Sequence, residues 1–175
     1  MNHALAISAS GGVGFRPITG ADRDTLAEIY ASTRREELAP LLDWSEAQKE
    51  AFLRQQFEHQ HNFYQQTYSE AAYALITRGE EVLGRLYVDR RGDEIRIIDI
   101  ALLPQHRGQG IGGSIVQGLL EEAVTREQGR VVRIHVEHSN PAMRLYQRLG
   151  FREIEDKEIY KLMEWRPEAT AGKPG

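Results

Sequence analysis

The amino-acid sequence predicts an α/β fold: one mixed sheet of six to seven strands, antiparallel in its first half, flanked by about four helices. Three observations predict it. Two strand-like runs, 72–77 and 82–89, are joined by a glycine-containing turn. An apolar run over 95–103 leads through a glycine-rich loop into a helix-like periodicity. A further apolar run at 131–136 then completes one strand–helix–strand crossover, which makes it a parallel partner of the 95–103 strand.

The length and composition fit a single domain. With 175 residues, of which 41% are hydrophobic, the chain can bury a sizeable core. We expect a flexible N-terminus over 1–14, one domain over 15–166 and a disordered tail over 167–175. The net charge of −4 argues against nucleic acid as a partner, and no apolar run reaches the roughly 18 residues of a membrane span. We therefore expect a cytoplasmic protein with neither nucleic-acid nor membrane partners.

The first elements of the chain are an edge strand and two helices. Pro17 cannot donate to a strand ladder, so 15–18 is a short edge strand. A helix begins near Asp22, and Pro40 interrupts the pattern. Ser45 to Gln48 then has the form of a capping box before a long helix that reaches about Tyr68. His59 and His61 do not share a helix face, and we expect no metal site. Cysteine is absent, which excludes cysteine nucleophiles.

The last elements alternate helices and strands. Helical periodicity covers 111–128 and is closed by Gly129. Asn140 suits a helix cap and Pro141 the first helical position of the next helix, which Gly150 ends. Two final strands are expected over 151–155 and 158–165.

The loop between the 95–103 strand and the following helix predicts a phosphate site. Gly108, Gly110, Gly112 and Gly113 allow a ligand to approach the backbone closely. The free N–H groups and the positive dipole end of the helix favour an anion there.

Two stretches resemble the GNAT superfamily of acyl-CoA-dependent N-acyltransferases. The run 105–110, QHRGQG, is similar to the Q/R-x-x-G-x-G/A pyrophosphate loop of that family. The run 140–151 is similar to a family segment with an Asn at a helix start, a Tyr six residues later and a closing Gly-Phe. The resemblance covers about 95–151. It implies a GNAT-like fold and an N-acetyltransferase that moves the acetyl group of acetyl-CoA to a primary amine by direct attack, without a covalent enzyme intermediate.

The resemblance also implies cofactor contacts. Backbone groups of the loop would cradle the pyrophosphate, and the pantetheine arm would add like a strand where the 95–103 and 131–136 strands splay. Asn140 would hold pantetheine. The expected cofactor-binding residues are Leu102, Leu103, Gln105, Arg107, Gly108, Gln109, Gly110, Ile111, Gly112 and Asn140.

Tyr146 is the candidate general acid, because an unperturbed pKa of about 10 keeps it protonated at neutral pH. Three candidates remain for the general base: Asp99, His135 and a water molecule. Asp99 lies on an apolar strand, and an acid there is costly to bury unless it is paired or functional. His135 resembles by position a Glu that some family members use. Each of the three side chains could instead have a structural role. Tyr146 would then be a core aromatic, and Asp99 and His135 would bond to neighbouring backbone groups.

Acceptor specificity should come from outside the two matched stretches. The candidates are Glu36 and Glu37, placed in a loop, with Tyr64 on the second helix and Tyr87 on an early strand. Carboxylates there could hold an ammonium group. The expected acceptor is a small-molecule or peptide amine, and the chain is expected to be a monomer or homodimer.

Two other functions fit parts of the sequence. The run 108–113 also satisfies G-x-G-x-x-G, which is typical of dinucleotide-binding oxidoreductases, but it follows antiparallel strands and only one crossover is present. A non-catalytic acyl-CoA sensor would share the fold without turnover.

Overall fold

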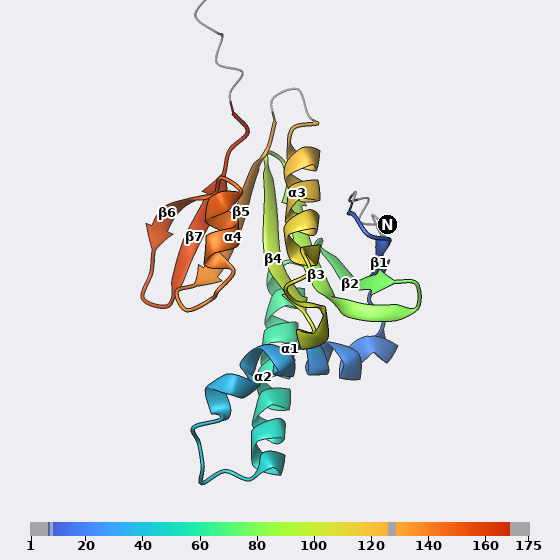
Figure 1. Cartoon of the computed structure of the whole chain (residues 1–175), viewed down its shortest axis with the longest axis vertical. Helices are drawn as coiled ribbons and strands as arrows, with labels where there is room; N and C mark the ends of the chain where they lie inside the picture. Colours follow the sequence, from blue (N-terminus) through green and yellow to red (C-terminus); the bar gives the residue numbers. More distant parts are fainter. Residues whose placement is uncertain (1–6, 8, 126–128, 169–175) are drawn as a thin grey trace, which may run out of the picture.

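The computed structural model describes residues 7, 9–125 and 129–168. These residues form a seven-stranded mixed sheet and four α-helices, as the sequence predicted (Figure 1). The strands are β1 Val13–Pro17, β2 Ala72–Arg78, β3 Glu81–Arg91, β4 Glu94–Leu102, β5 Val131–Glu137, β6 Arg152–Asp156 and β7 Tyr160–Trp165. The helices are α1 Arg23–Leu38, α2 Glu46–Thr67, α3 Ile111–Ala123 and α4 Met143–Arg148, with 3₁₀ turns η1 at Gly20–Asp22 and η2 at Pro104–His106.

The sheet has the strand order β1-β2-β3-β4-β5-β7-β6. The β4–β5 pair is parallel, and the other five pairings are antiparallel. The α3 crossover joins the parallel pair, as expected of a strand–helix–strand unit. That pairing holds only from Glu94–Val131 to Ile97–Ile134. The two strands diverge beyond it, and the sheet is open at its centre.

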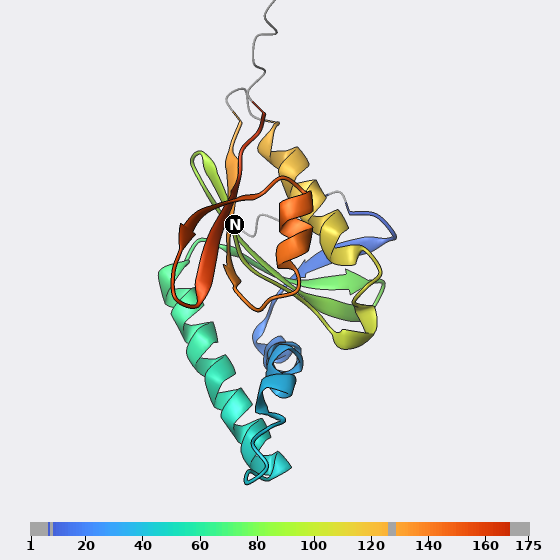
Figure 2. The same cartoon turned by 60° about the vertical axis from the view of Figure 1, so that its left-hand side comes forward.

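Each face of the sheet carries its own core. Ile115 and Leu119 of α3 and Tyr146 of α4 pack with Ile97 and Ile134 on one face. On the other face, α1 and α2 supply a second cluster. Its fully buried members include Leu26, Ile29, Phe57, Leu75 and Tyr87. Figures 1 and 2 show that part of the α1–α2 pair extends beyond one end of the sheet.

The capping box before α2 is confirmed. Gln48 N donates to Ser45 Oγ at 3.1 Å, and Ser45 N donates to Gln48 Oε1 at 2.8 Å. Two helix boundaries were wrong. The third helix ends at Ala123 rather than Gln128, and residues 126–128 lie outside the described part. The fourth helix begins at Met143 rather than at Asn140.

The ends of the domain also differ in detail from the expectation. The first strand starts at Val13, two residues earlier than predicted, and Ile7 is buried against the α3 side of the core. Residues 1–6, 8 and 169–175 lie outside the described residues. The expected flexibility of the two chain ends therefore stays a prediction. Within the described residues, no helix is both long enough and apolar enough to cross a membrane.

Candidate active site

The connection from β4 to α3 has the backbone geometry expected of an anion site. Gly108 and Gly110 both take left-handed backbone angles, with φ of 73° and 81°, and the space at their missing Cβ positions is open. Gly110 is the N-cap of α3. The N–H groups of the first helical turn, from Ile111 to Gly113, have no partners inside the helix. Open backbone donors at a positive helix end suit the pyrophosphate that the resemblance implies.

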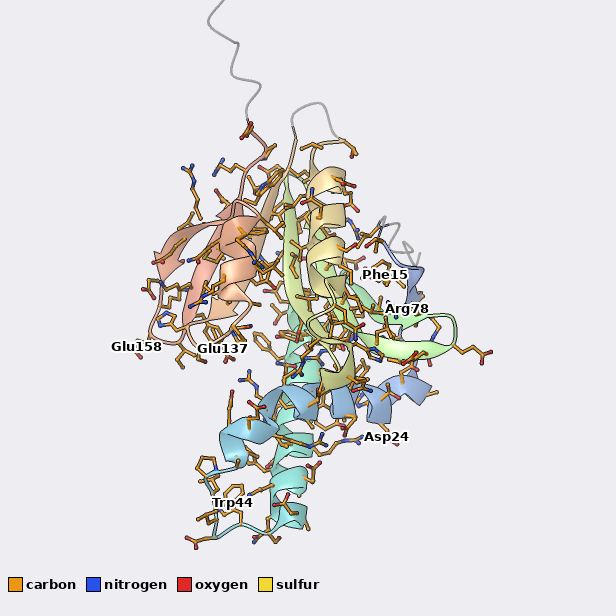
Figure 3. All side chains as sticks on the ribbon, viewed as in Figure 1. Phe15, Asp24, Trp44, Arg78, Glu137 and Glu158 are labelled. Atoms are coloured by element: carbon orange, nitrogen blue, oxygen red, sulfur yellow. The ribbon has the colours of Figure 1, made fainter. Side chains whose placement is uncertain are left out.

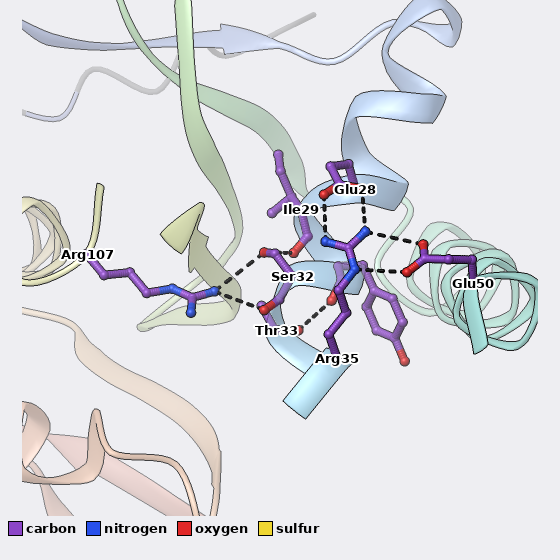
Figure 4. A network of polar contacts seen from close by, with 8 residues as sticks. Glu28, Ile29, Ser32, Thr33, Arg35, Glu50 and Arg107 are labelled. Carbon is purple, nitrogen blue, oxygen red and sulfur yellow. Dashed lines mark hydrogen bonds and ion pairs between the residues drawn. The ribbon is translucent and has the colours of Figure 1, made fainter. Parts of the chain in front are cut away.

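Arg107 connects this loop to two other elements. Its Nε donates to the Leu102 carbonyl at 2.9 Å, and its Nη2 lies 3.3 Å and 3.4 Å from the carbonyl and hydroxyl oxygens of Ser32 on α1 (Figure 4). Gln109 turns back onto the loop, with Nε2 donating to the Gln105 carbonyl at 3.0 Å. Both side chains therefore hold the loop in shape, and the backbone supplies the outward-facing donors.

The gap between β4 and β5 is marked by a β-bulge. Tyr87 pairs with Asp99 and Val88 with Ile97, so Ile98 is the extra residue of β4. The bulge comes directly after the last β4–β5 pair, Ile97–Ile134. From there to Leu102 the ladder runs to β3 only, which leaves one edge of β4 for an extended ligand chain.

Tyr146 lies on α4, in the core cluster on the α3 side of the sheet. It is 3% exposed and packs edge-on against Phe151, with ring centroids 5.5 Å apart. Burial, and then the negative charge of Asp99, raise the pKa of its hydroxyl. The side chain is thus both a core aromatic and a phenol held in its protonated form. The structure therefore places Asp99 near enough for its charge to act on the Tyr146 hydroxyl.

Asp99 is not free in the gap. Its Oδ2 accepts a hydrogen bond from Arg85 Nη2 at 2.5 Å, and its side chain is 17% exposed. Arg85 itself is buried in the layer under α1 and α2. Asp99 therefore belongs to the face that carries Ala101 and Leu103, as the strand pattern indicated.

His135 occupies a different position from Asp99. It directly follows Ile134, the last β5 residue paired with β4, and it is exposed. Partial burial, followed by the charges of Arg96 and Lys157, lowers its pKa, which favours the neutral imidazole that a base requires. Asn140 is also exposed, and its Oδ1 accepts from Ala142 N at 2.9 Å at the start of the turn into α4.

The predicted acceptor residues do not form one group. Glu36 and Glu37 lie in the last turn of α1 rather than in a loop, because the helix continues to Leu38. Tyr64 is half-buried and packs edge-on against Tyr87 at 6.2 Å. Tyr87 is 1% exposed, and within the described part of the chain its buried hydroxyl has no hydrogen-bond partner. Tyr87 can thus support an acceptor site but not touch the acceptor in this structure.

An open cavity of about 530 Å³ lies beside Glu37, between α1, α2 and the ends of β5 and β7. Arg34 bridges its two carboxylates: Nη1 lies 3.0 Å from Glu37 Oε1, and Nη2 lies 2.5 Å from Glu137 Oε1. Figure 3 shows Glu137 at the end of the β5–β7 half that faces α1. The aromatic lining comes from Tyr30, Phe52, Phe63 and Tyr160. Sequence reasoning missed Arg34, Glu137 and Tyr160, because no local pattern joins residues about a hundred positions apart.

Comparison with known proteins identifies the family. The sequence model of the Acetyltransferase (GNAT) family matches residues 27–151. The chain belongs to the GNAT acetyltransferase family. This GNAT protein is 30% identical over 90 residues to the thialysine N-epsilon-acetyltransferase of Bos taurus, which covers 50% of the chain and 53% of that relative. The chain thus spans about half the length of the curated relative it matches.

Solved structures show the same fold. The PaiA N-acetyltransferase of Thermoplasma acidophilum, solved in complex with coenzyme A, superimposes with a TM-score of 0.66 at 17% identity, over 90% of this chain and 100% of that one. An acetyltransferase from Thermus thermophilus gives 0.59 at 18% identity, over 90% and 99%. The predicted GNAT-like fold is confirmed. With one parallel strand pair, the sheet also departs from the dinucleotide-binding folds that the glycine pattern allowed.

Proposed function

We propose that this GNAT protein transfers the acetyl group of acetyl-CoA to a primary amine, with Tyr146 as the general acid. The observation that carries the proposal is the buried phenol of Tyr146, whose pKa is raised by burial and then by the charge of Asp99 on β4. Acetyl-CoA supplies the thioester. The loop from Gly108 to Gly112 offers backbone N–H groups for its pyrophosphate, and Leu102 and Leu103 lie at the β4 edge for its arm.

The side chains then divide the proton transfers. The amine nitrogen forms a bond to the acetyl carbon, the carbon–sulfur bond breaks, and Tyr146 gives its proton to the leaving sulfur. The amine must lose a proton in the same sequence. Asp99, His135 or a water receives it: the charge of Asp99 acts on Tyr146, and the lowered pKa of His135 favours the neutral imidazole.

The cavity beside Glu37 and Glu137 supports an amine acceptor, since carboxylates attract an ammonium group and aromatic rings pack on its apolar body. Tyr64 lies near the Asp99 carboxylate, since burial and then the charge of Asp99 raise the pKa of its hydroxyl. The bovine relative is named for the ε-nitrogen of thialysine. An amine at the end of a flexible chain is therefore the first acceptor class to test.

The experiment is a panel of amines with acetyl-CoA, covering thialysine, lysine, polyamines and peptides, followed by release of free thiol. In Tyr146→Phe, kcat should fall by about 10²–10⁴, the usual contribution of a positioned acid, while the Kd for CoA stays within about twofold. Tyr68→Phe, a half-buried tyrosine at the end of α2, serves as the matched control and should keep its rate. CoA binding without thiol release across the whole panel would instead support the sensor.

A further inference from the structure

A buried arginine lies directly behind the proposed reaction centre. Arg85 on β3 is 3% exposed, and its guanidinium carbon lies 4.9 Å from the ring centre of Tyr87 and 6.0 Å from that of Tyr30. Its Nε atom is buried and has no hydrogen-bond partner among the residues that the structure describes. Burying such a cation is costly, and a well-packed apolar side chain in its place is often at least as stable. Stability alone therefore does not account for Arg85.

The contacts of Arg85 converge on one carboxylate. Within the described residues its salt bridge is to Asp99, through Nη2 and Oδ2 at 2.5 Å. The same nitrogen donates to Gln60 Oε1 at 2.8 Å, and Gln60 lines the acceptor cavity. The guanidinium thus fixes Asp99 from one side and is itself fixed by α2 from the other.

Asp99 sits among hydroxyl groups from three elements. Its charge raises the pKa of Tyr87 on β3, of Tyr64 on α2 and of Tyr146 on α4, in each case after burial. His135 of β5 lies just past the last β4–β5 pair. Within the described residues the cation that contacts Asp99 is Arg85, and any carboxylate that loses its paired cation takes up a proton more readily.

We propose that Arg85 is a positioning residue for acetyl transfer, which fixes the Asp99 carboxylate by binding Oδ2 and leaves Oδ1 to accept the proton of the attacking amine. The proposal rests on the acetyl-transfer function above and selects Asp99 over His135 as the group that receives this proton. Arg85 acts only through Asp99 and touches neither substrate.

The test is a double-mutant cycle on kcat/KM with the best amine of the panel. Arg85→Met keeps the length of the side chain and removes the charge, and we expect a loss of at least tenfold, carried by kcat, with the Kd for CoA unchanged. Asp99→Asn should lose as much or more. The double variant should be no slower than Asp99→Asn alone, because Arg85 has nothing left to position. Arg85→Lys, which restores the charge, should recover part of the rate.

A pH profile separates positioning from folding. In Arg85→Met the acid limb of kcat/KM should move to higher pH, so that part of the rate returns as the pH rises. A structural defect would lower the rate by the same factor at every pH. Arg90→Met is the matched control, since Arg90 is also on β3 and pairs with Glu122 on α3, far from the reaction centre. It should leave the profile unchanged.

The outcomes are distinct. If wild-type protein releases no thiol with any amine, the acetyl-transfer function fails and the role of Arg85 fails with it. If wild type is active but the losses of Arg85→Met and Asp99→Asn multiply in the double variant, only the role of Arg85 is overturned. An unshifted acid limb in Arg85→Met overturns it as well.

Discussion

Gly84 on β3 lies where β3 and β4 approach most tightly, and Gly84→Ala should strain both strands. A Cβ at this position would lie 2.0 Å from the carbonyl oxygen of Ala101 and 2.9 Å from the Cα of Leu102. Both obstacles are backbone atoms, so no side-chain rotation relieves the clash. The two strands must separate at the end of β4 that leads into the glycine loop.

The cost follows from overpacking, which is typically about 1–3 kcal/mol. We expect the upper end, about 3 kcal/mol, because backbone must move. For a chain of this size each kcal/mol lowers Tm by roughly 2–4 °C, so the melting temperature should fall by about 6–12 °C. Affinity for CoA should fall too, because the edge that carries Leu102 is displaced.

Thermal unfolding and calorimetric titration with CoA measure the two effects. Gly14→Ala is the control, since its Cβ would meet Thr77 Oγ1 at an ordinary 3.6 Å on the edge strand β1. It should change the free energy of unfolding by no more than about 0.5 kcal/mol, as surface substitutions usually do. If Gly84→Ala melts within a degree of wild type, the close approach of β3 and β4 does not hold and the reasoning is refuted.

Two further predictions concern the loop and acid stability. Gly110→Ala places a side chain at φ 81°, which costs about 1–2 kcal/mol. The Kd for CoA should rise about tenfold for each 1.4 kcal/mol by which this strain weakens the bound form of the loop. An unchanged Kd in calorimetry would contradict the anion site. His61 and His135 both have lowered pKa values, first through burial and then through the charges of Arg23 and Arg96 respectively. The folded chain therefore binds fewer protons than the unfolded chain below about pH 6.5, and the free energy of unfolding in urea should decline as the pH falls through that range. His61→Gln should flatten the decline, and an equally steep decline in that variant would exclude this cause.

Local signals in the sequence predicted the fold well. The capping box at Ser45, the break at Pro104 and the glycine loop each act through neighbouring residues, and the structure has all three. The end of α3 was missed because the β-branched Val124 and Thr125 close the helix with a tighter turn, in which Thr125 Oγ1 donates to the Glu122 carbonyl at 2.7 Å.

Contacts between distant residues could not be predicted. Arg85 is a charged residue inside an apparently ordinary alternating strand, and only the fold places it under α2 with Asp99 as its partner. The start of α4 was missed for a local reason, since Asn140 Oδ1 accepts a hydrogen bond from the Ala142 N–H in a turn that precedes the helix. The cavity carboxylate Glu137 meets Arg34 from the other half of the chain.

The short β4–β5 ladder places the proposed catalytic groups on the two halves of the sheet. One half of the sheet, β1 to β4, includes Asp99 on β4 and leads into the glycine loop. The other half consists of β5, β7 and β6, and α4 with Tyr146 connects β5 to β6. Four residue pairs form the joint. A thioester arm bound in the gap between β4 and β5 would separate the proposed acid from the proposed base. The thickness of that arm, rather than any single side chain, would then set the distance between the two groups that exchange protons with the substrates.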